Sequence, residues 1–216
     1  MFGFKIEVWG NYACFSRPEL KVERVSYDII TPSAARGIFE AVFWKPAIRY
    51  IIDEIAVCAP IRFDNIRRNE VNGIVSSNGT PIIATEDRAQ RAALVLRNVR
   101  YLILAHFEMT KKAGTEDNKE KFMNIILRRL EKGQTFHQPY LGTREFPAHI
   151  RLIQNDESAP SPIKESRDLG LMLYDIKYKY EKDEKGKDIV KEFKPTYFFA
   201  KMVNGVVNLR KVEVLS

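Results

Sequence analysis

Cysteine is scarce in this sequence, and the two cysteines do not form a recognisable site. Cys14 and Cys58 each stand in an apolar stretch, without a second cysteine or a histidine at ligand spacing. Structural zinc sites need four such ligands, and disulfide-stabilised secreted domains need many more cysteines. We therefore expect two buried free thiols in a reducing compartment, and neither a metal nor another cofactor.

Long hydrophobic runs are also absent. No apolar segment approaches the ~20 residues that span a bilayer, and the first residues, MFGFKIEVWG, lack the features of a secretory signal. Metalloprotease, P-loop and dinucleotide-binding motifs are missing too, so nothing supports nucleotide- or metal-dependent chemistry. We expect a cytoplasmic protein with no membrane partner.

Positive charge, in contrast, is in excess. Thirty-five Lys and Arg residues stand against twenty-eight Asp and Glu residues, which leaves a formal net charge of +7. This balance favours a polyanionic partner, although many basic proteins bind no nucleic acid. The hydrophobic fraction of 45% is typical of a folded chain, and 216 residues fit one large domain or a medium domain with an appendage.

Alternating or β-branched residues predict four strands in the first two thirds of the chain. They are expected at residues 4–9, 49–57, 94–109 and 148–154. The polar stretch 64–91, between the second and third of these strands, is expected to be a functional or mobile loop.

Two helices are expected between these strands. Residues 34–45 show helical spacing, with Thr31 as N-cap and Pro46 as the stop. Residues 117–132 form an amphipathic pattern that places Phe122 on the apolar stripe and Gly133 at the C-terminal cap.

The resulting order is that of the ferredoxin-like βαββαβ unit, which RRM-like binders of single-stranded RNA also use. Further strands are expected at residues 169–180, 195–203 and 206–214, the last two joined by a tight turn at Asn204-Gly205. We therefore predict an α+β fold. Residues 1–154 would form a ferredoxin-like RNA-binding domain, and residues 155–216 a small C-terminal antiparallel β-sheet domain.

Three runs of sequence resemble a known family. Residues 8–50, residues 60–71 (PIRFDNIRRNEV) and residues 138–146 (QPYLGTREF) are similar to the CRISPR-associated Cas five family of the RAMP superfamily, in its subtype I-C (Dvulg) branch. The resemblance implies a metal-independent endoribonuclease in antiviral defence, which cleaves pre-CRISPR RNA 3′ of the repeat hairpin and leaves a 2′,3′-cyclic phosphate. It also implies retention on the 5′ handle, contacts with other subunits of the type I-C interference complex, and binding of duplex DNA.

The catalytic residues that this resemblance implies are only partly present. Phe43, Lys121 and Phe122 match a tyrosine and a Lys-His pair of the family, and neither phenylalanine transfers a proton. Lys121 stays a catalytic candidate, and His137 is the best remaining base, because it lies in a loop with an aromatic ring and an arginine. A solvated side chain is the alternative interpretation for both, and we expect His106 to be a hydrogen-bonded structural histidine.

Candidates for RNA contact are basic and aromatic side chains near the expected sheet edge, the first helix and the loops. They are Tyr12, Arg17, Tyr27, Arg36, Lys45, Arg62, Arg67, Arg68, Tyr140 and Arg144. A solvated charged face is the alternative around the first helix. Two functions stay open: an endoribonuclease, or a catalytically silent handle-binding scaffold, which Phe43 and Phe122 favour.

Overall fold

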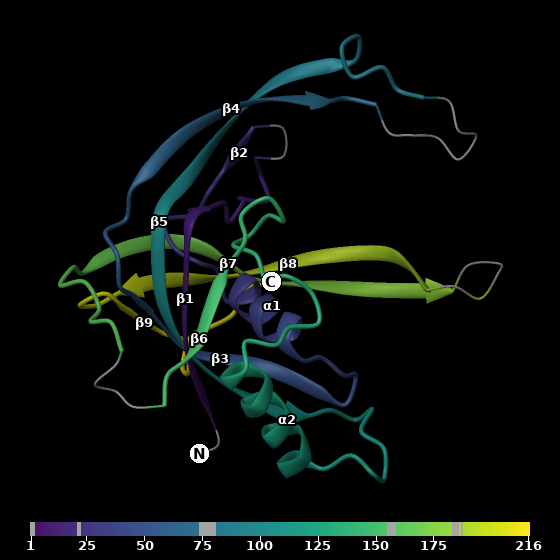
Figure 1. Cartoon of the computed structure of the whole chain (residues 1–216), viewed down its shortest axis with the longest axis vertical. Coiled ribbons are helices and arrows are strands. Elements are labelled where there is room, and N and C mark those ends of the chain that lie inside the picture. Colours follow the sequence, from purple (N-terminus) through teal and green to yellow (C-terminus); the bar gives the residue numbers. More distant parts are fainter. Residues whose placement is uncertain (1–2, 21–22, 74–80, 155–158, 183–185, 187) are drawn as a thin grey trace.

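The chain forms a main sheet, two helices and a separate two-stranded hairpin (Figure 1). The structure is a computed structural model that describes residues 3–20, 23–73, 81–154, 159–182, 186 and 188–216. None of the helices among these residues has the length and apolarity to cross a membrane. The elements are β1 (Phe4–Ala13), β2 (Arg24–Val25), α1 (Pro32–Val42), β3 (Ile48–Val57), β4 (Phe63–Val71), β5 (Arg88–Met109), α2 (Lys119–Glu131), β6 (His149–Leu152), β7 (Arg167–Lys182), β8 (Asp188–Met202) and β9 (Val206–Asn208).

The main sheet has the strand order β6-β1-β5-β3-β9, and each of these neighbouring pairs is antiparallel. Short β2 and long β4 pair with the outer part of β5. The predicted α+β class is confirmed. All four strands predicted in the first two thirds of the chain are present, and β1 and β5 are longer than expected.

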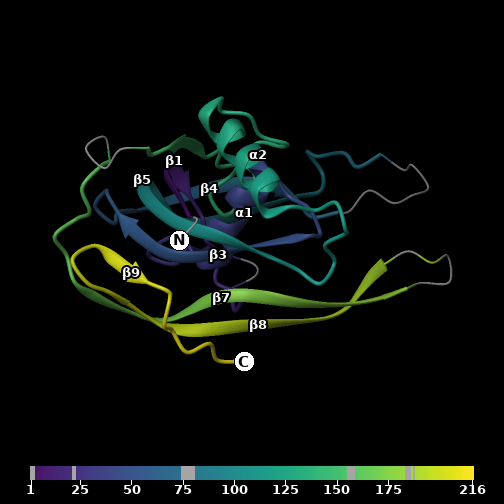
Figure 2. The ribbon, with the colours of Figure 1, turned by 90° about the horizontal axis from the view of Figure 1, so that it is seen from below.

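One face of this sheet, which we call the first face, carries the core. Ile6 of β1 and Ile103 of β5 are fully buried there, in one cluster with Phe39 of α1, Phe122 of α2 and Phe198 of β8. Helix α1 lies between α2 and the β7–β8 hairpin and contacts both (Figure 2). Burial of these apolar side chains supplies the main driving force for joining the layers.

The helices begin as the sequence predicts, and α1 ends earlier. The Thr31 hydroxyl accepts a hydrogen bond from the amide of Ala34, as expected of an N-cap. The predicted end at Lys45 is wrong, because Phe43 is already extended, with φ −155°. In α2, Lys132 is the C-cap, and Gly133 follows it with a positive φ of 62°.

The prediction of a loop at residues 64–91 is wrong, because both ends of this stretch lie in strands. Its first part is strand β4, which pairs with residues 88–96 of β5 to form a hairpin that we call the β4–β5 arm. Half-buried and exposed residues alternate strictly along β4, a strand pattern within a polar sequence. Residues 74–80 lie outside the described part of the chain.

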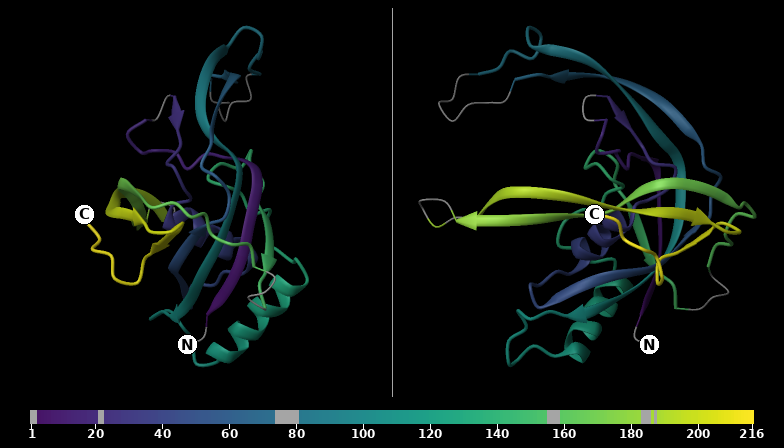
Figure 3. Two further views of the ribbon diagram at one scale, coloured as in Figure 1. Left: turned by 90° about the vertical axis from the view of Figure 1, so that its left-hand side faces the viewer. Right: turned by 180° about the vertical axis from the view of Figure 1, so that it is seen from behind.

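The C-terminal segment departs from the predicted three-stranded sheet. Strands β7 and β8 form a two-stranded hairpin, the β7–β8 arm, whereas β9 pairs with β3 of the main sheet. Asn204 and Gly205 make the predicted tight turn, with φ values of 47° and 77°. The predicted domain boundary adjoins residues 155–158, which are outside those described. Both arms extend in the same direction from the body of the molecule (Figure 3).

The opposite side of the main sheet, which we call the second face, is covered only in part. Glu7 and Trp9 of β1 lie there, since side chains alternate along a strand. A small apolar cluster of Ala56, Leu102 and Ile153, packed against Ala159 and neighbouring side chains, covers one region of this face.

Candidate nucleic-acid interface

The loop between α2 and β6, residues 133–148, lies along helix α1. At one end the Phe136 amide donates a hydrogen bond to the carbonyl oxygen of Ala41, at 2.7 Å. At the other end Tyr140 lines a cavity of about 340 Å³ together with Ser33 and Gly37 of α1. The loop therefore follows the helix from its C-terminal to its N-terminal turn.

Gly142 allows this loop to approach strand β1 closely. Its φ of +86° favours glycine, and an added Cβ would overlap the carbonyl oxygen of Cys14. The approach is held by a 3.0 Å hydrogen bond from the Cys14 amide to the carbonyl oxygen of Leu141. Both cysteines are free; Cys14 is buried as expected, whereas Cys58 is only half-buried.

Three polar side chains of the loop gather at the surface. His137, Tyr140 and Arg144 line a second cavity of about 360 Å³, and His137 and Arg144 are exposed. Within the described residues, the His137 ring makes one hydrogen bond, which joins Nδ1 to the carbonyl oxygen of Gln138, at 3.3 Å. An imidazole, a phenol and a guanidinium can together accept a proton, stack on a base and bind a phosphate.

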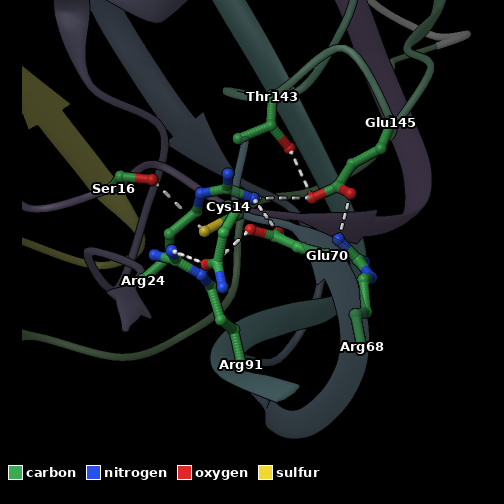
Figure 4. Close-up of polar contacts among 9 residues, drawn as sticks. Cys14, Ser16, Arg24, Arg68, Glu70, Arg91, Thr143 and Glu145 are labelled. Atoms are coloured by element: carbon green, nitrogen blue, oxygen red, sulfur yellow. Dashed lines mark hydrogen bonds and ion pairs between the residues drawn. The ribbon is translucent and has the colours of Figure 1, made fainter. Parts of the chain in front are cut away.

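A cluster of ion pairs attaches the loop to the β4–β5 arm (Figure 4). Glu145 accepts a hydrogen bond from Arg68 of β4 and from the hydroxyl of Thr143, and lies 3.7 Å from Arg24 of β2. Glu70 of β4 in turn binds Arg24, at 3.3 Å. Through its hydrogen bond and charge, Arg68 lowers the pKa of the Glu145 carboxyl below its ordinary value.

This cluster divides the predicted Arg62, Arg67 and Arg68 patch. Arg68 is bound to Glu145, and its guanidinium lies 5.2 Å from the ring centre of Phe146. Arg67 is exposed on the other face of β4, and Arg62 is exposed just before the strand. Arg68 therefore positions the loop, and only Arg62 and Arg67 stay at the surface as phosphate candidates.

The positions that match the family's catalytic motif do meet in space. The rings of Phe43 and Phe122 lie 5.7 Å apart, and their exposed fractions are 7% and 0%. Lys121 is exposed in the first turn of α2. The Nζ of Lys45 lies 5.3 Å from the Phe122 ring, and it also lies 3.7 Å from Asp117. Phe122 is a core residue, as the helical pattern predicted.

The predicted stacking edge of Tyr12, Arg17 and Tyr27 needs a correction. Tyr27 is 1% exposed, and the Arg17 guanidinium lies 4.5 Å from its ring centre, so this ring is not available to a base. Burial raises the pKa of Tyr27 to about 12. Tyr12 is half-buried and packs 6.0 Å from Phe146.

Arg36 has a structural partner that the sequence did not reveal. From α1 it forms ion pairs with Asp175 of β7 and with Glu40, one turn further along the helix. Arg36 therefore ties the helix to the β7–β8 arm instead of facing solvent. His106 is a hydrogen-bonded structural histidine, as expected, because its Nδ1 lies 2.8 Å from Asp53.

Tyr178 of β7 is a site residue that sequence reasoning missed. It lines the same cavity as Tyr140 and Ser33, and half of it, 51%, is exposed. The sequence placed it in a solvated hairpin tip. Alternation along β7 indicates which face of the strand it shares, but nothing local indicates which element that face meets.

The model of the Cas5d family, described as CRISPR-associated protein (Cas_Cas5), matches residues 3–210. The CRISPR pre-crRNA endoribonuclease Cas5d of Mannheimia succiniciproducens is 45% identical over 221 residues, covering 95% of this chain and 93% of that protein. The protein of the same description from Thermus thermophilus is 45% identical over 178 residues, covering 82% and 75%.

Two solved structures share the fold. A structure described as a CRISPR-associated protein has a TM-score of 0.70 at 23% identity, covering 99% of this chain and 96% of its own. A functionally uncharacterised protein, SMU1763c from Streptococcus mutans, has a TM-score of 0.66 at 21% identity, covering 97% and 92%. The overall fold is thus shared with both.

Proposed function

The chain belongs to the CRISPR-associated Cas5d family, and from this we propose that it is an endoribonuclease that processes pre-CRISPR RNA. The observation that carries the proposal is the 45% identity to a pre-crRNA endoribonuclease over 95% of this chain. The loop residues His137, Tyr140 and Arg144, which line one cavity, supply polar groups suited to an RNA strand.

The βαββαβ part of the main sheet is, in this proposal, a ferredoxin-like unit. Its support is the spatial order β6-β1-β5-β3, with the two helices in one core against the first face. The RNA would cross the helical side of this unit, along α1 and the loop of residues 133–148. Residues 1–154 would bind it, and the segment after residue 155 would close the cavity through Tyr178.

The proposed chemistry needs no metal. His137 would take the proton of the 2′-hydroxyl, whose oxygen attacks the adjacent phosphorus. The bond from phosphorus to the 5′-oxygen breaks, this oxygen takes a proton from solvent, and the products are a 2′,3′-cyclic phosphate and a 5′-hydroxyl. Lys121 would stabilise the negative charge of the transition state. Tyr12, Arg17, Lys45, Arg62, Arg67 and Arg144 would contact the RNA backbone or bases at the edges of the path.

After cleavage the protein would stay on the 5′ handle as a subunit of the type I-C interference complex, and its basic surface would also bind duplex DNA. A second candidate is a handle-binding scaffold without catalysis. The buried Phe43–Phe122 pair favours it, because these rings fill the place where the family resemblance expects proton-transfer groups.

Cleavage of the cognate repeat RNA in EDTA tests these proposals. The wild-type protein is expected to cut once, 3′ of the hairpin, and His137→Ala and Lys121→Ala are each expected to slow the cut by about 100-fold or more. Lys111→Ala, a change of an exposed lysine in the turn after β5, is the matched control. No cut by the wild type, with tight RNA binding retained, would instead establish the scaffold.

A further inference from the structure

A row of three side chains crosses the second face of the main sheet. Trp9 of β1 pairs with Arg100 of β5 on one side and with His149 of β6 on the other, so all three point to the same face. The rings of Trp9 and His149 are stacked, with centres 5.5 Å apart and planes 23° from parallel. His149 is exposed, so the stack ends at the protein surface.

Arg100, which lies beside this stack, is held in place by a buried carboxylate. Glu7 is only 1% exposed, and it accepts 2.5 Å hydrogen bonds from Arg100 Nε and from Arg151. Two guanidinium groups and one carboxylate leave one excess positive charge, 2 − 1 = +1. Arg100 contacts Glu7 through Nε, and 48% of its side chain is exposed, so the guanidinium group has further N–H donors that could bind a ligand.

The apolar cover of the second face does not include this row. The cluster around Ala56, Leu102 and Ile153 protects the neighbouring part of the face, whereas Arg100 and His149 stay exposed. Asn11, two residues beyond Trp9 on β1, is exposed as well and adds hydrogen-bonding groups. Solvation of a sheet face does not require an indole that is stacked on an exposed imidazole and lies beside an arginine.

We propose that Trp9, His149 and Arg100 form a binding surface for single-stranded nucleic acid, separate from the interface along α1. One unpaired base would extend the Trp9–His149 stack, and Arg100 would bind the adjoining phosphate. The internal bases of a duplex cannot bind in this way, because they are already stacked on both faces, so a duplex offers only its ends. The surface does not depend on cleavage, so it would serve either the nuclease or the scaffold.

Tryptophan fluorescence gives a readout that is specific to this surface. The chain has two tryptophans, and Trp44→Phe leaves Trp9 as the only one. Oligouridylate is expected to quench the Trp9 emission, less strongly as the salt concentration rises. Oligothymidylate of the same length tells RNA from DNA as the source of the strand, and a blunt RNA duplex is expected to quench the emission far less than the single strand does.

Two variants in the Trp44→Phe background make the test decisive. His149→Ala and Arg100→Gln are each expected to weaken the binding that Trp9 reports by about fivefold or more. His149→Ala keeps the ion pairs of Glu7, so its effect does not arise from an unpaired buried carboxylate. Lys111→Gln is the charge-matched control and is expected to change little.

Three outcomes would overturn the proposal. They are no quenching by either oligonucleotide, equal quenching by the duplex, or quenching that neither variant weakens. His137→Ala separates this proposal from the proposed cleavage: it is expected to slow the cut by about 100-fold or more and to leave the Trp9 signal intact.

Discussion

At the scale of single residues, the candidate site lacks the proton-transfer groups that the family resemblance implies, but the loop of residues 133–148 is held in place by its backbone. Phe43 and Phe122 contact each other where the family resemblance expects proton-transfer groups, so the chemistry must come from other side chains. His137 is placed by its backbone, since the neighbouring Phe136 amide is bonded to α1. Gly142 then lets the same loop press against β1.

Gly142→Ala is expected to destabilise the protein by about 2–4 kcal/mol, because the new Cβ adds overlap with Cys14 to the cost of a positive φ. Urea unfolding measures the loss. Gly133→Ala is the matched control: its φ is also positive, +62°, but no atom lies within 4 Å of the added Cβ. It is expected to cost about 1–2 kcal/mol, so equal effects of the two variants would contradict the close approach.

At the scale of elements, the β4–β5 arm and the loop after α2 are held together by charge. Glu145 of the loop and Glu70 of β4 bind arginines from β2, β4 and β5. These ion pairs join the loop to strands that are distant from it in sequence. Partly exposed ion pairs of this kind contribute little individually. Their role is to set the direction of the arm relative to His137 and Arg144.

Glu145→Gln is expected to lower stability by about 0.5 kcal/mol at neutral pH, a small value because the carboxylate is partly exposed. The folded-state pKa of Glu145 is lowered, chiefly by Arg68. Its contribution is therefore present above the ordinary carboxyl pKa of about 4.3 and is lost as the pH falls through the lowered value.

Urea unfolding at neutral pH and at successively lower pH measures this difference. The gap between wild type and Glu145→Gln is expected to narrow below about pH 4.3. Glu213→Gln, at an exposed position near the C-terminus, is the control. A gap that stays constant down to strongly acidic pH would show that the ion pair with Arg68 contributes nothing.

At the scale of the whole molecule, the C-terminal segment is part of the central core. Phe198 of β8 is 1% exposed and lies in the same cluster as Ile6 and Phe39, and β9 completes the main sheet beside β3. Arg36 adds an ion pair between α1 and β7. These contacts couple the segment after residue 155 to the rest of the chain.

Phe198→Ala is expected to destabilise the whole chain by about 3–5 kcal/mol in a single unfolding transition, because it leaves a cavity in the shared core. Circular dichroism and tryptophan fluorescence during urea unfolding measure it, and the two signals should coincide. Phe199→Ala, at a neighbouring residue that is 73% exposed, is the control. Two separate transitions would mean that the C-terminal part folds independently.

The sequence by itself determined the α+β class, the order of the four predicted strands and two helices in residues 1–154, the Thr31 N-cap, the core role of Phe122 and the family. These features depend on local periodicity, on capping and on contiguous motifs, which are all written in neighbouring residues. Only the tertiary structure decided that the polar stretch after residue 63 pairs with β5, that Tyr27 is buried, that Arg36 and Arg68 are bound, and that Trp9 meets His149. Each of these depends on partners brought together by strand pairing and packing over long stretches of chain, and no local pattern specifies such partners.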